Sequence, residues 1–113
     1  PEDYDLILTG DLGMLGKELA TELIRRSGYE IAGKIEDCGC LIFDESQDVH
    51  MGGSGCGCSA SVLNSEIYKK LRDGTYKKIL FVATGALLSL TSSMQGDSVP
   101  SIAHAVCIRG ENA

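Results

Sequence analysis

The segment at residues 48–61, DVHMGGSGCGCSAS, concentrates the residue types of this chain that are best suited to chemistry. Four glycines and two cysteines lie within residues 52–58. Thiolates at this density can hold a metal ion or form a redox pair, whereas glycines allow an anion to approach backbone N–H groups. The spacing of these residues and the elements around the loop indicate which of these three kinds of site is favoured.

The cysteine spacing does not favour a metal centre or a redox pair. The chain has five cysteines, Cys38, Cys40, Cys56, Cys58 and Cys107. The first four form two Cys-Gly-Cys pairs, but structural zinc sites usually separate paired ligands by two to four residues. Thioredoxin-like redox motifs need Cys-x-x-Cys. An odd number of cysteines, with Cys107 in an apolar run, fits a reducing compartment. We therefore expect no metal and no cofactor, with a zinc or iron–sulfur centre and a dithiol as the alternatives.

The loop suits an anion better than a metal. A glycine-rich loop that leads into a helix N-terminus offers N–H groups and the positive end of the helix dipole. Serine hydroxyls in the same segment add donors. The order GGSGCGCS matches neither common nucleotide-binding glycine pattern, so a nucleotide is not the favoured ligand. The predicted ligand-binding residues are His50, Gly53, Ser54, Gly55, Cys56, Gly57, Cys58 and Ser59.

Two further polar residues, His104 and Asp11, are expected to stabilise the fold rather than to bind a ligand or catalyse a reaction. His104 lies in an apolar run and is expected to be a core histidine bonded to the backbone. Asp11 follows a strand and is expected to cap the helix that begins there, rather than to act as a base. We predict no catalytic residue in this chain.

Hydrophobic periodicity predicts the elements that position the loop. Residues 5–9 predict a buried strand, and a helix follows from Asp11 to about Ser27, with Gly28 as its stop. Leucines at 15, 19 and 23 form the predicted apolar stripe of this helix, opposite its charged residues.

The second half of the chain repeats this alternation. Residues 40–43 predict a short strand, 59–73 a helix with an apolar stripe, 79–83 a central strand covered on both faces, 85–100 a loop and 101–108 a final strand. Strands alternating with helices indicate an α/β layered fold.

Composition limits the possible functions. The 113 residues carry a net charge of −6 and a pI near 4.7, which excludes a general nucleic-acid-binding surface. No apolar run is long enough to span a membrane. Because the chain starts at a proline, we expect it to be a piece of a longer protein.

Four segments together carry a resemblance to a known family. YDLILTGDLG, QDVHMGGSGCGCSAS, LFVATGALLS and SIAHAV resemble, in order and spacing, the C-terminal half of the stage V sporulation protein AD family. The resemblance implies an α/β fold like that of thiolases and ketoacyl synthases. In that fold two similar halves, each with a five-stranded mixed sheet, pack into five layers with helices on both faces of each sheet. Residues 1–113 would be the second half, without the N-terminal half.

The resemblance also implies a function. Such a protein binds dipicolinic acid, an aromatic ring with two carboxylates, and supports its uptake into the developing spore. It would lie peripherally at the spore inner membrane. Its implied partners are the missing N-terminal half, a second copy in a homodimer and other spore membrane transport proteins, with no nucleic acid.

Departures from the catalytic relatives argue against an enzyme. Ketoacyl synthases of this fold carry a histidine after the first strand of this half, and an asparagine or histidine in the later glycine loop. Here those positions read Thr9-Gly10-Asp11 and Gly53-Ser54-Gly55-Cys56, without the donors that condensation needs. The alternative is an acyl-transfer enzyme fragment that uses Cys56 or Cys58.

The resemblance further predicts which helix is buried between the two halves. We expect it to be the helix after the glycine loop, because it begins with three small residues at 59–61. The isolated chain would then expose a large apolar face. We therefore expect it to be marginally stable, and to self-associate or need its partner.

Overall fold

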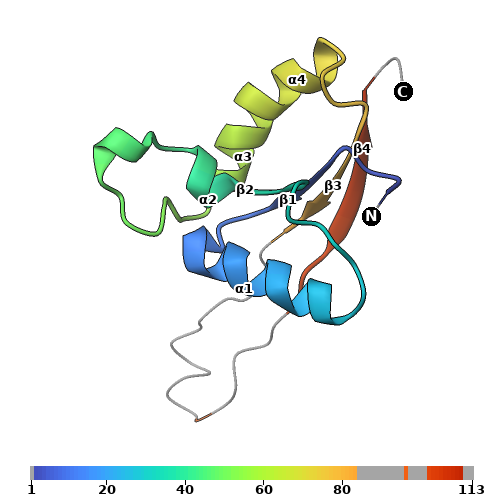
Figure 1. The fold of residues 1–113 in the computed structure, drawn as a ribbon. Coiled ribbons are helices and arrows are strands. Elements are labelled where there is room, and N and C mark those ends of the chain that lie inside the picture. The colour runs from blue at the N-terminus through green and yellow to red at the C-terminus, as the bar shows by residue number, and fades with distance from the viewer. Residues whose placement is uncertain (1, 84–95, 97–101, 111–113) are drawn as a thin grey trace.

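The structure, a computed structural model, describes residues 2–83, 96 and 102–110. Its strands are β1 (Leu6–Thr9), β2 (Ile35–Asp37), β3 (Lys78–Val82) and β4 (Ala105–Arg109). They form one mixed sheet in the order β2-β1-β3-β4, in which β1 pairs parallel to β2 and β3 and only β4 is antiparallel (Figure 1). The α/β prediction is confirmed. The sheet has four strands within the described residues, not the five that we expected.

Helices cover the two faces of this sheet (Figure 1). The helix α1 (Gly13–Arg26) covers the face that carries Ile7 and Ile35. A second helical segment lies on the face that carries Leu8 and Ile79. It consists of α3 (Cys58–Val62), the π-helical turn η2 (Leu63–Ile67) and α4 (Tyr68–Arg72). The two apolar clusters therefore follow the alternation of side chains along β1.

The predicted second helix is confirmed, with one local difference. It was expected over 59–73 and runs from Cys58 to Arg72, with a wider π turn in its middle. Val62 and Ile67 are buried, and Leu63 and Leu71 pack against the same cluster, so its apolar stripe faces the core as expected.

The helix α1 has the predicted extent but a different orientation. Its end is an αL stop at Gly28, whose φ is +100° and whose N–H donates to the Arg25 carbonyl. However, Leu15, Leu19 and Leu23 are more than half exposed, and Ile24 packs against the core instead. The predicted inward-facing leucine stripe is therefore wrong.

Two strand predictions need correction. Residues 40–43 are not a strand, because β2 ends at Asp37 and the short helix α2 (Cys38–Leu41) follows at once, before the 3₁₀ turn η1 (Glu45–Gln47). Glycine is needed at position 39 of this helix, because the backbone passes against Gly53, whose carbonyl would lie 2.5 Å from a Cβ at Gly39.

The central strand is confirmed, since β3 pairs with both β1 and β4. The last strand begins only at Ala105. His104 precedes it and is exposed, so its assignment as a core histidine is wrong. The predicted loop 85–100 lies outside the described residues, apart from residue 96.

A buried carboxylate joins the first three elements. Asp37, at the end of β2, is fully buried. It accepts hydrogen bonds from the Thr9 hydroxyl at 2.6 Å, the Leu12 N–H at 2.9 Å and the Gly13 N–H at 3.0 Å. Asp37 therefore accepts hydrogen bonds from N–H groups at the start of α1, although it lies outside this helix. An N-cap side chain does the same from within its own helix. The prediction that Asp11 caps this helix is wrong.

Replacing this carboxylate tests how much of the fold depends on it. In Asp37→Asn, an amide NH₂ would replace one acceptor oxygen and face N–H donors. We expect the free energy of unfolding to fall by about 2–4 kcal/mol, because buried donors lose their partner. Urea unfolding followed by circular dichroism measures this.

Asp5 provides the matched control. Its carboxylate also accepts two backbone N–H groups, from Lys77 and Lys78, but it is exposed. Water can replace the lost acceptor at this exposed position. Asp5→Asn should therefore lower the free energy of unfolding clearly less than Asp37→Asn does. Equal losses for the two variants would contradict the role assigned to burial at Asp37.

Candidate functional site

The glycine loop holds a carboxylate of the chain itself. The Ser54 hydroxyl donates to Asp11 Oδ2 at 2.7 Å, and the Gly55 N–H donates to the same oxygen at 3.3 Å. Both donors are on the surface. The loop then enters the helical segment at Cys58, with Gly57 as its N-cap. The loop leads into a helix as the sequence predicts, and the carboxylate that it holds belongs to the same chain.

The glycines of the loop fall into two groups. Gly52 and Gly53 are packed, because a Cβ at either would collide with Gly39 or with Ile42. In contrast, a Cβ at Gly55 or Gly57 would meet no atom within 4 Å. Gly55 has a φ of +118°, which favours glycine for its conformation alone. Only the second group is open to a ligand.

The paired cysteines point in different directions. Cys38 and Cys58 are both buried in the core cluster beneath the helical segment. Cys40 is half-buried and Cys56 is exposed. Among the residues that the structure describes, no three His, Cys, Asp or Glu side chains gather in a way that could hold a metal ion.

The surroundings of the buried thiols keep them protonated. Burial, and then the neighbouring Cys58 and Asp37, raise the pKa of Cys38 to about 12. Burial and the charges of Asp11 and Asp37 also raise the pKa of Cys58. A reactive thiolate at a helix start needs a lowered pKa. The environment of Cys58 is therefore opposite to what the acyl-transfer alternative requires.

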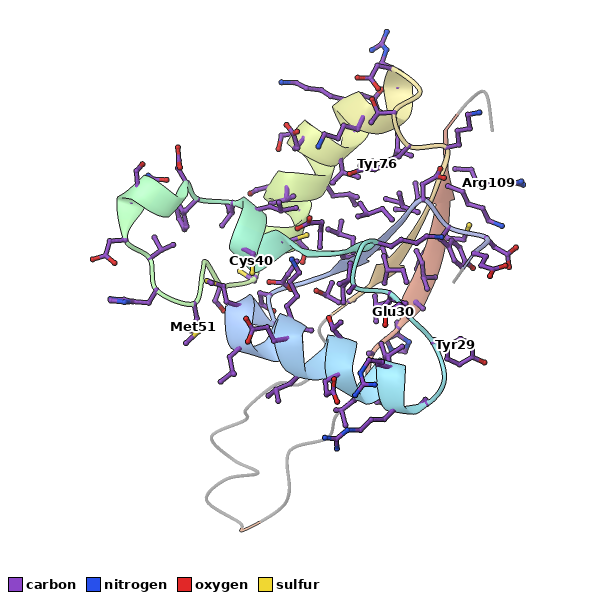
Figure 2. All side chains as sticks on the ribbon, viewed as in Figure 1. Tyr29, Glu30, Cys40, Met51, Tyr76 and Arg109 are labelled. Carbon is purple, nitrogen blue, oxygen red and sulfur yellow. The ribbon has the colours of Figure 1, made fainter. Side chains whose placement is uncertain are left out.

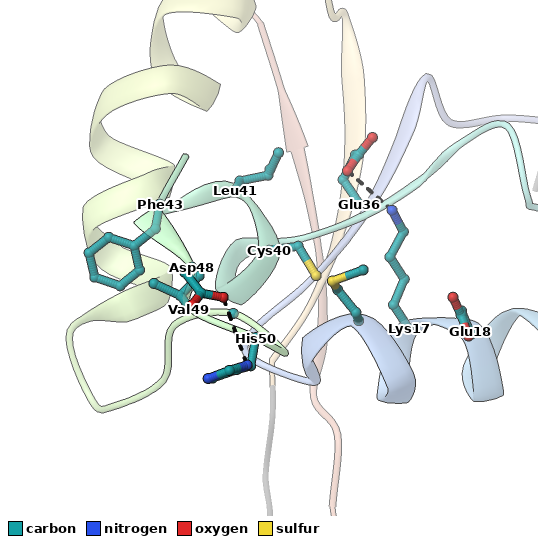
Figure 3. A pocket seen from close by; sticks show the side chains of 11 residues that line it. Lys17, Glu18, Glu36, Cys40, Leu41, Phe43, Asp48, Val49 and His50 are labelled. Carbon is teal, nitrogen blue, oxygen red and sulfur yellow. Dashed lines mark hydrogen bonds and ion pairs between the residues drawn. The ribbon is translucent and has the colours of Figure 1, made fainter. Parts of the chain in front are cut away.

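A cavity of about 500 Å³ lies beside the loop, between α1 and α2 (Figure 3). Apolar side chains form part of the wall of this cavity. Figure 2 places Met51 near the first turn of α1, and the Met51 carbonyl accepts a hydrogen bond from the Met14 N–H. The charged residues that line the cavity are Lys17, Glu18, Glu36 and Asp48, together with His50.

The cavity is unfavourable for an anion. Lys17 is paired with Glu36 at 3.4 Å, and His50 Nδ1 lies 4.0 Å from Asp48. Three carboxylates against one lysine leave a negative surplus. Asp48 and His50 both have positive φ, so this part of the loop is held in a sparsely populated backbone conformation. A dicarboxylate ligand would be repelled here.

The structure thus separates the predicted site residues. His50 lines the acidic cavity, Gly53 is packed inside the loop and Cys58 is in the core. The exposed part of the loop contains Ser54, Gly55, Cys56 and Gly57, and the half-buried Ser59 follows it. Sequence reasoning missed that Asp11 is the partner of this loop. The available signal was its position directly after β1, at the carboxyl edge of the sheet where loops converge.

The fold and the loop define a mixed α/β protein whose glycine loop binds a carboxylate at the entry to a helix. The chain belongs to the stage V sporulation protein AD family, whose sequence model matches residues 1–109. It is 49% identical over 105 residues to stage V sporulation protein AD of Bacillus subtilis (strain 168). That match covers 93% of this chain and 31% of the relative, so the chain spans about a third of the curated relative's length. In the described part of the chain, no helix is long and apolar enough to cross a membrane.

Thiol labelling distinguishes a structural from a reactive Cys58. We expect iodoacetamide at pH 8 to modify the exposed Cys56 and Cys107, while Cys38 and Cys58 react only after unfolding, because burial excludes the reagent and raises the pKa of both thiols. Mass spectrometry of tryptic peptides measures this. Cys107 is the internal control. Labelling of Cys58 as fast as Cys107 at pH 8 would favour the acyl-transfer alternative.

The raised pKa of Cys38 also predicts a pH dependence of stability. Its folded pKa of about 12 lies above the ordinary value of 9.0, so the unfolded chain loses this proton first as the pH rises. The contribution of the protonated thiol should therefore be complete below about pH 9 and be lost between pH 9 and 12. Urea unfolding at pH 8 and pH 10.5 should show a larger decrease for the wild type than for Cys38→Ala.

Proposed function

We propose that this protein acts in spore formation by binding dipicolinic acid and supporting its uptake into the developing spore. The site would be the exposed part of the glycine loop, from Ser54 to Ser59. The carrying observation is that the Ser54 hydroxyl and the Gly55 N–H already bind one carboxylate, that of Asp11. Family membership supports the role in sporulation.

Ligand binding would proceed by exchange of one carboxylate for another. A ligand carboxylate would take the donors that Asp11 now occupies, and the open space at Gly55 and Gly57 would admit a flat ring close to the backbone. The helical segment that starts at Cys58 directs its N-terminal end toward the same loop, and this end favours negative charge.

The second carboxylate of dipicolinic acid needs a positive group from outside these residues. The chain carries a net charge of −6, and Lys17, the lysine in the neighbouring cavity, is already paired with Glu36. We therefore propose that the rest of the longer family polypeptide completes the site, in a thiolase-like arrangement of two halves. A homodimer and spore membrane transport proteins are the further partners that we propose, at the spore inner membrane.

We also propose that the chain is not an enzyme. Cys58, the thiol at the start of α3, is buried and has a raised pKa, which supports a structural role. His50, the histidine of segment 48–61, lies 4.0 Å from Asp48 and lines the acidic cavity.

A negative charge added to the loop tests the site. The suitable protein is an exchange protein, in which these residues replace the matching 105 residues of the Bacillus subtilis relative. In this protein Gly55→Asp should weaken dipicolinate binding about tenfold or more, because it adds a negative charge where a carboxylate must bind. Isothermal titration calorimetry measures the affinity.

Two further variants make the result interpretable. Gly74 also has a positive φ and open space around it, but it lies in a distant turn. Gly74→Asp therefore reproduces the backbone strain and the added charge, and it should leave affinity unchanged. Asp11→Asn removes the competing charge and should strengthen binding. If both Gly55→Asp and Asp11→Asn bind dipicolinate like the wild type, the ligand does not use this loop.

A further inference from the structure

The cavity between α1 and α2 has large apolar side chains in its wall that stay open to it. Met14, Leu41 and Phe43 line the cavity and are 52%, 39% and 43% exposed. Its volume of about 500 Å³ is within the range of small-molecule sites, about 300–1,000 Å³. Exposed apolar side chains that gather around a cavity, unlike scattered ones, indicate a place where an apolar group binds.

Carboxylates lie on two different sides of this apolar wall. Figure 3 shows Asp48 on the side of the loop, and Glu18 and Glu36 on the side of α1 and β2. Cys40 lies between the two sides. The cavity therefore presents negative charge at both ends and apolar surface between them.

Only part of this negative charge is balanced by neighbouring cations. Lys17 pairs with Glu36 at 3.4 Å, and His50 Nδ1 lies 4.0 Å from Asp48, where both side chains are more than four-fifths exposed. Glu18 takes part in no ion pair among the described residues. The cavity therefore attracts a cation.

The spread of the carboxylates determines which kind of cation fits. Within the part of the chain that the structure describes, no three His, Cys, Asp or Glu side chains gather closely enough to hold a metal ion. A compact ion therefore has no set of ligands in this cavity. An elongated cation with an apolar middle can instead reach both charged sides and cover the wall between them.

We propose that this cavity binds an aliphatic diammonium ion, a hydrocarbon chain with an ammonium group at each end. The hydrocarbon lies on Met14, Leu41 and Phe43, and the ammonium groups lie near Asp48 and Glu18. Removal of the methylene groups from water supplies affinity, and the two carboxylates select charge and length. This site selects the opposite charge from the glycine loop, and it does not rest on the proposed function.

Calorimetry with three probes tests the charge and the length of the ligand. In the exchange protein, 1,5-diaminopentane should bind about fivefold or more tightly than pentylamine, because pentylamine carries one ammonium group. Calcium chloride at matched ionic strength should not displace the diamine. Displacement by calcium would show a metal site instead, and no saturable binding of the diamine would overturn the proposal.

Single charge removals locate the two ammonium groups. Glu18→Gln and Asp48→Asn should each weaken diamine binding about fivefold or more. Asn tolerates the positive φ of position 48, so the second variant keeps the loop conformation. Asp3→Asn is the matched control, because it removes the same charge from an exposed position before the opposite end of β1. Equal weakening by all three variants would reduce the effect to net charge and contradict the site.

Two further readouts separate this site from the glycine loop. Glu18→Gln should leave dipicolinate affinity unchanged. Saturating diamine should slow modification of the half-buried Cys40 by N-ethylmaleimide at pH 8 several-fold, because this thiol lines the cavity, while the exposed Cys107 should react as before. The labelling also works on the 113-residue chain if the exchange protein does not fold. Unchanged labelling of Cys40 at saturating diamine would overturn the proposal.

Discussion

The buried carboxylate of Asp37 is the interaction on which the other elements of this structure depend. It holds the ends of two parallel strands and the start of α1 together, through Thr9, Leu12 and Gly13. A buried charge is tolerated only when hydrogen bonds replace its lost hydration, and these donors provide them. Its position also restricts the chain next to it, because a Cβ at Gly39 would lie 2.9 Å from Asp37 Oδ2.

Asp37 also decides which helix N-terminus is available to a ligand. Because it occupies the N-terminus of α1, an external anion cannot bind there. The glycine loop before α3 is left as the carboxylate-binding element on the surface, where Ser54 and Gly55 hold Asp11. The two aspartates differ in their surroundings: Asp37 is fully buried in the fold, whereas the half-buried Asp11 accepts hydrogen bonds from exposed donors of the glycine loop.

Helices cover the four strands of the sheet unevenly. The face under the helical segment Cys58–Arg72 is well packed, with Leu8 and Ile79 fully buried. Helix α1 covers the other face over β1 and β2, whereas most of β4 is exposed, including Val106 on the face of the helical segment. We had expected the helix after the glycine loop to carry the surface that meets the rest of the protein. One stripe of that helix packs on the sheet, while Tyr68 on the same helix is exposed, and the expectation stays a prediction.

The sequence by itself determined the elements with strong local periodicity and the family to which the chain belongs. The first strand, the extent of α1 with its stop at Gly28, the helix after the loop and the central β3 were all predictable, because neighbours within one or two turns encode them. The motifs around the glycine loop carried the family resemblance, and the family match confirms it.

Only the tertiary structure decided the parts that depend on distant residues. Asp37 reaches Leu12 across 25 positions, and Ser54 reaches Asp11 across 43, so no local pattern could reveal either bond. Periodicity shows that Leu15, Leu19 and Leu23 share a side of α1, but it does not show which side the sheet meets. Likewise, the Cys-Gly-Cys spacing could not show that Cys58 is buried in the core while Cys56 stays on the surface, since packing between elements decides burial.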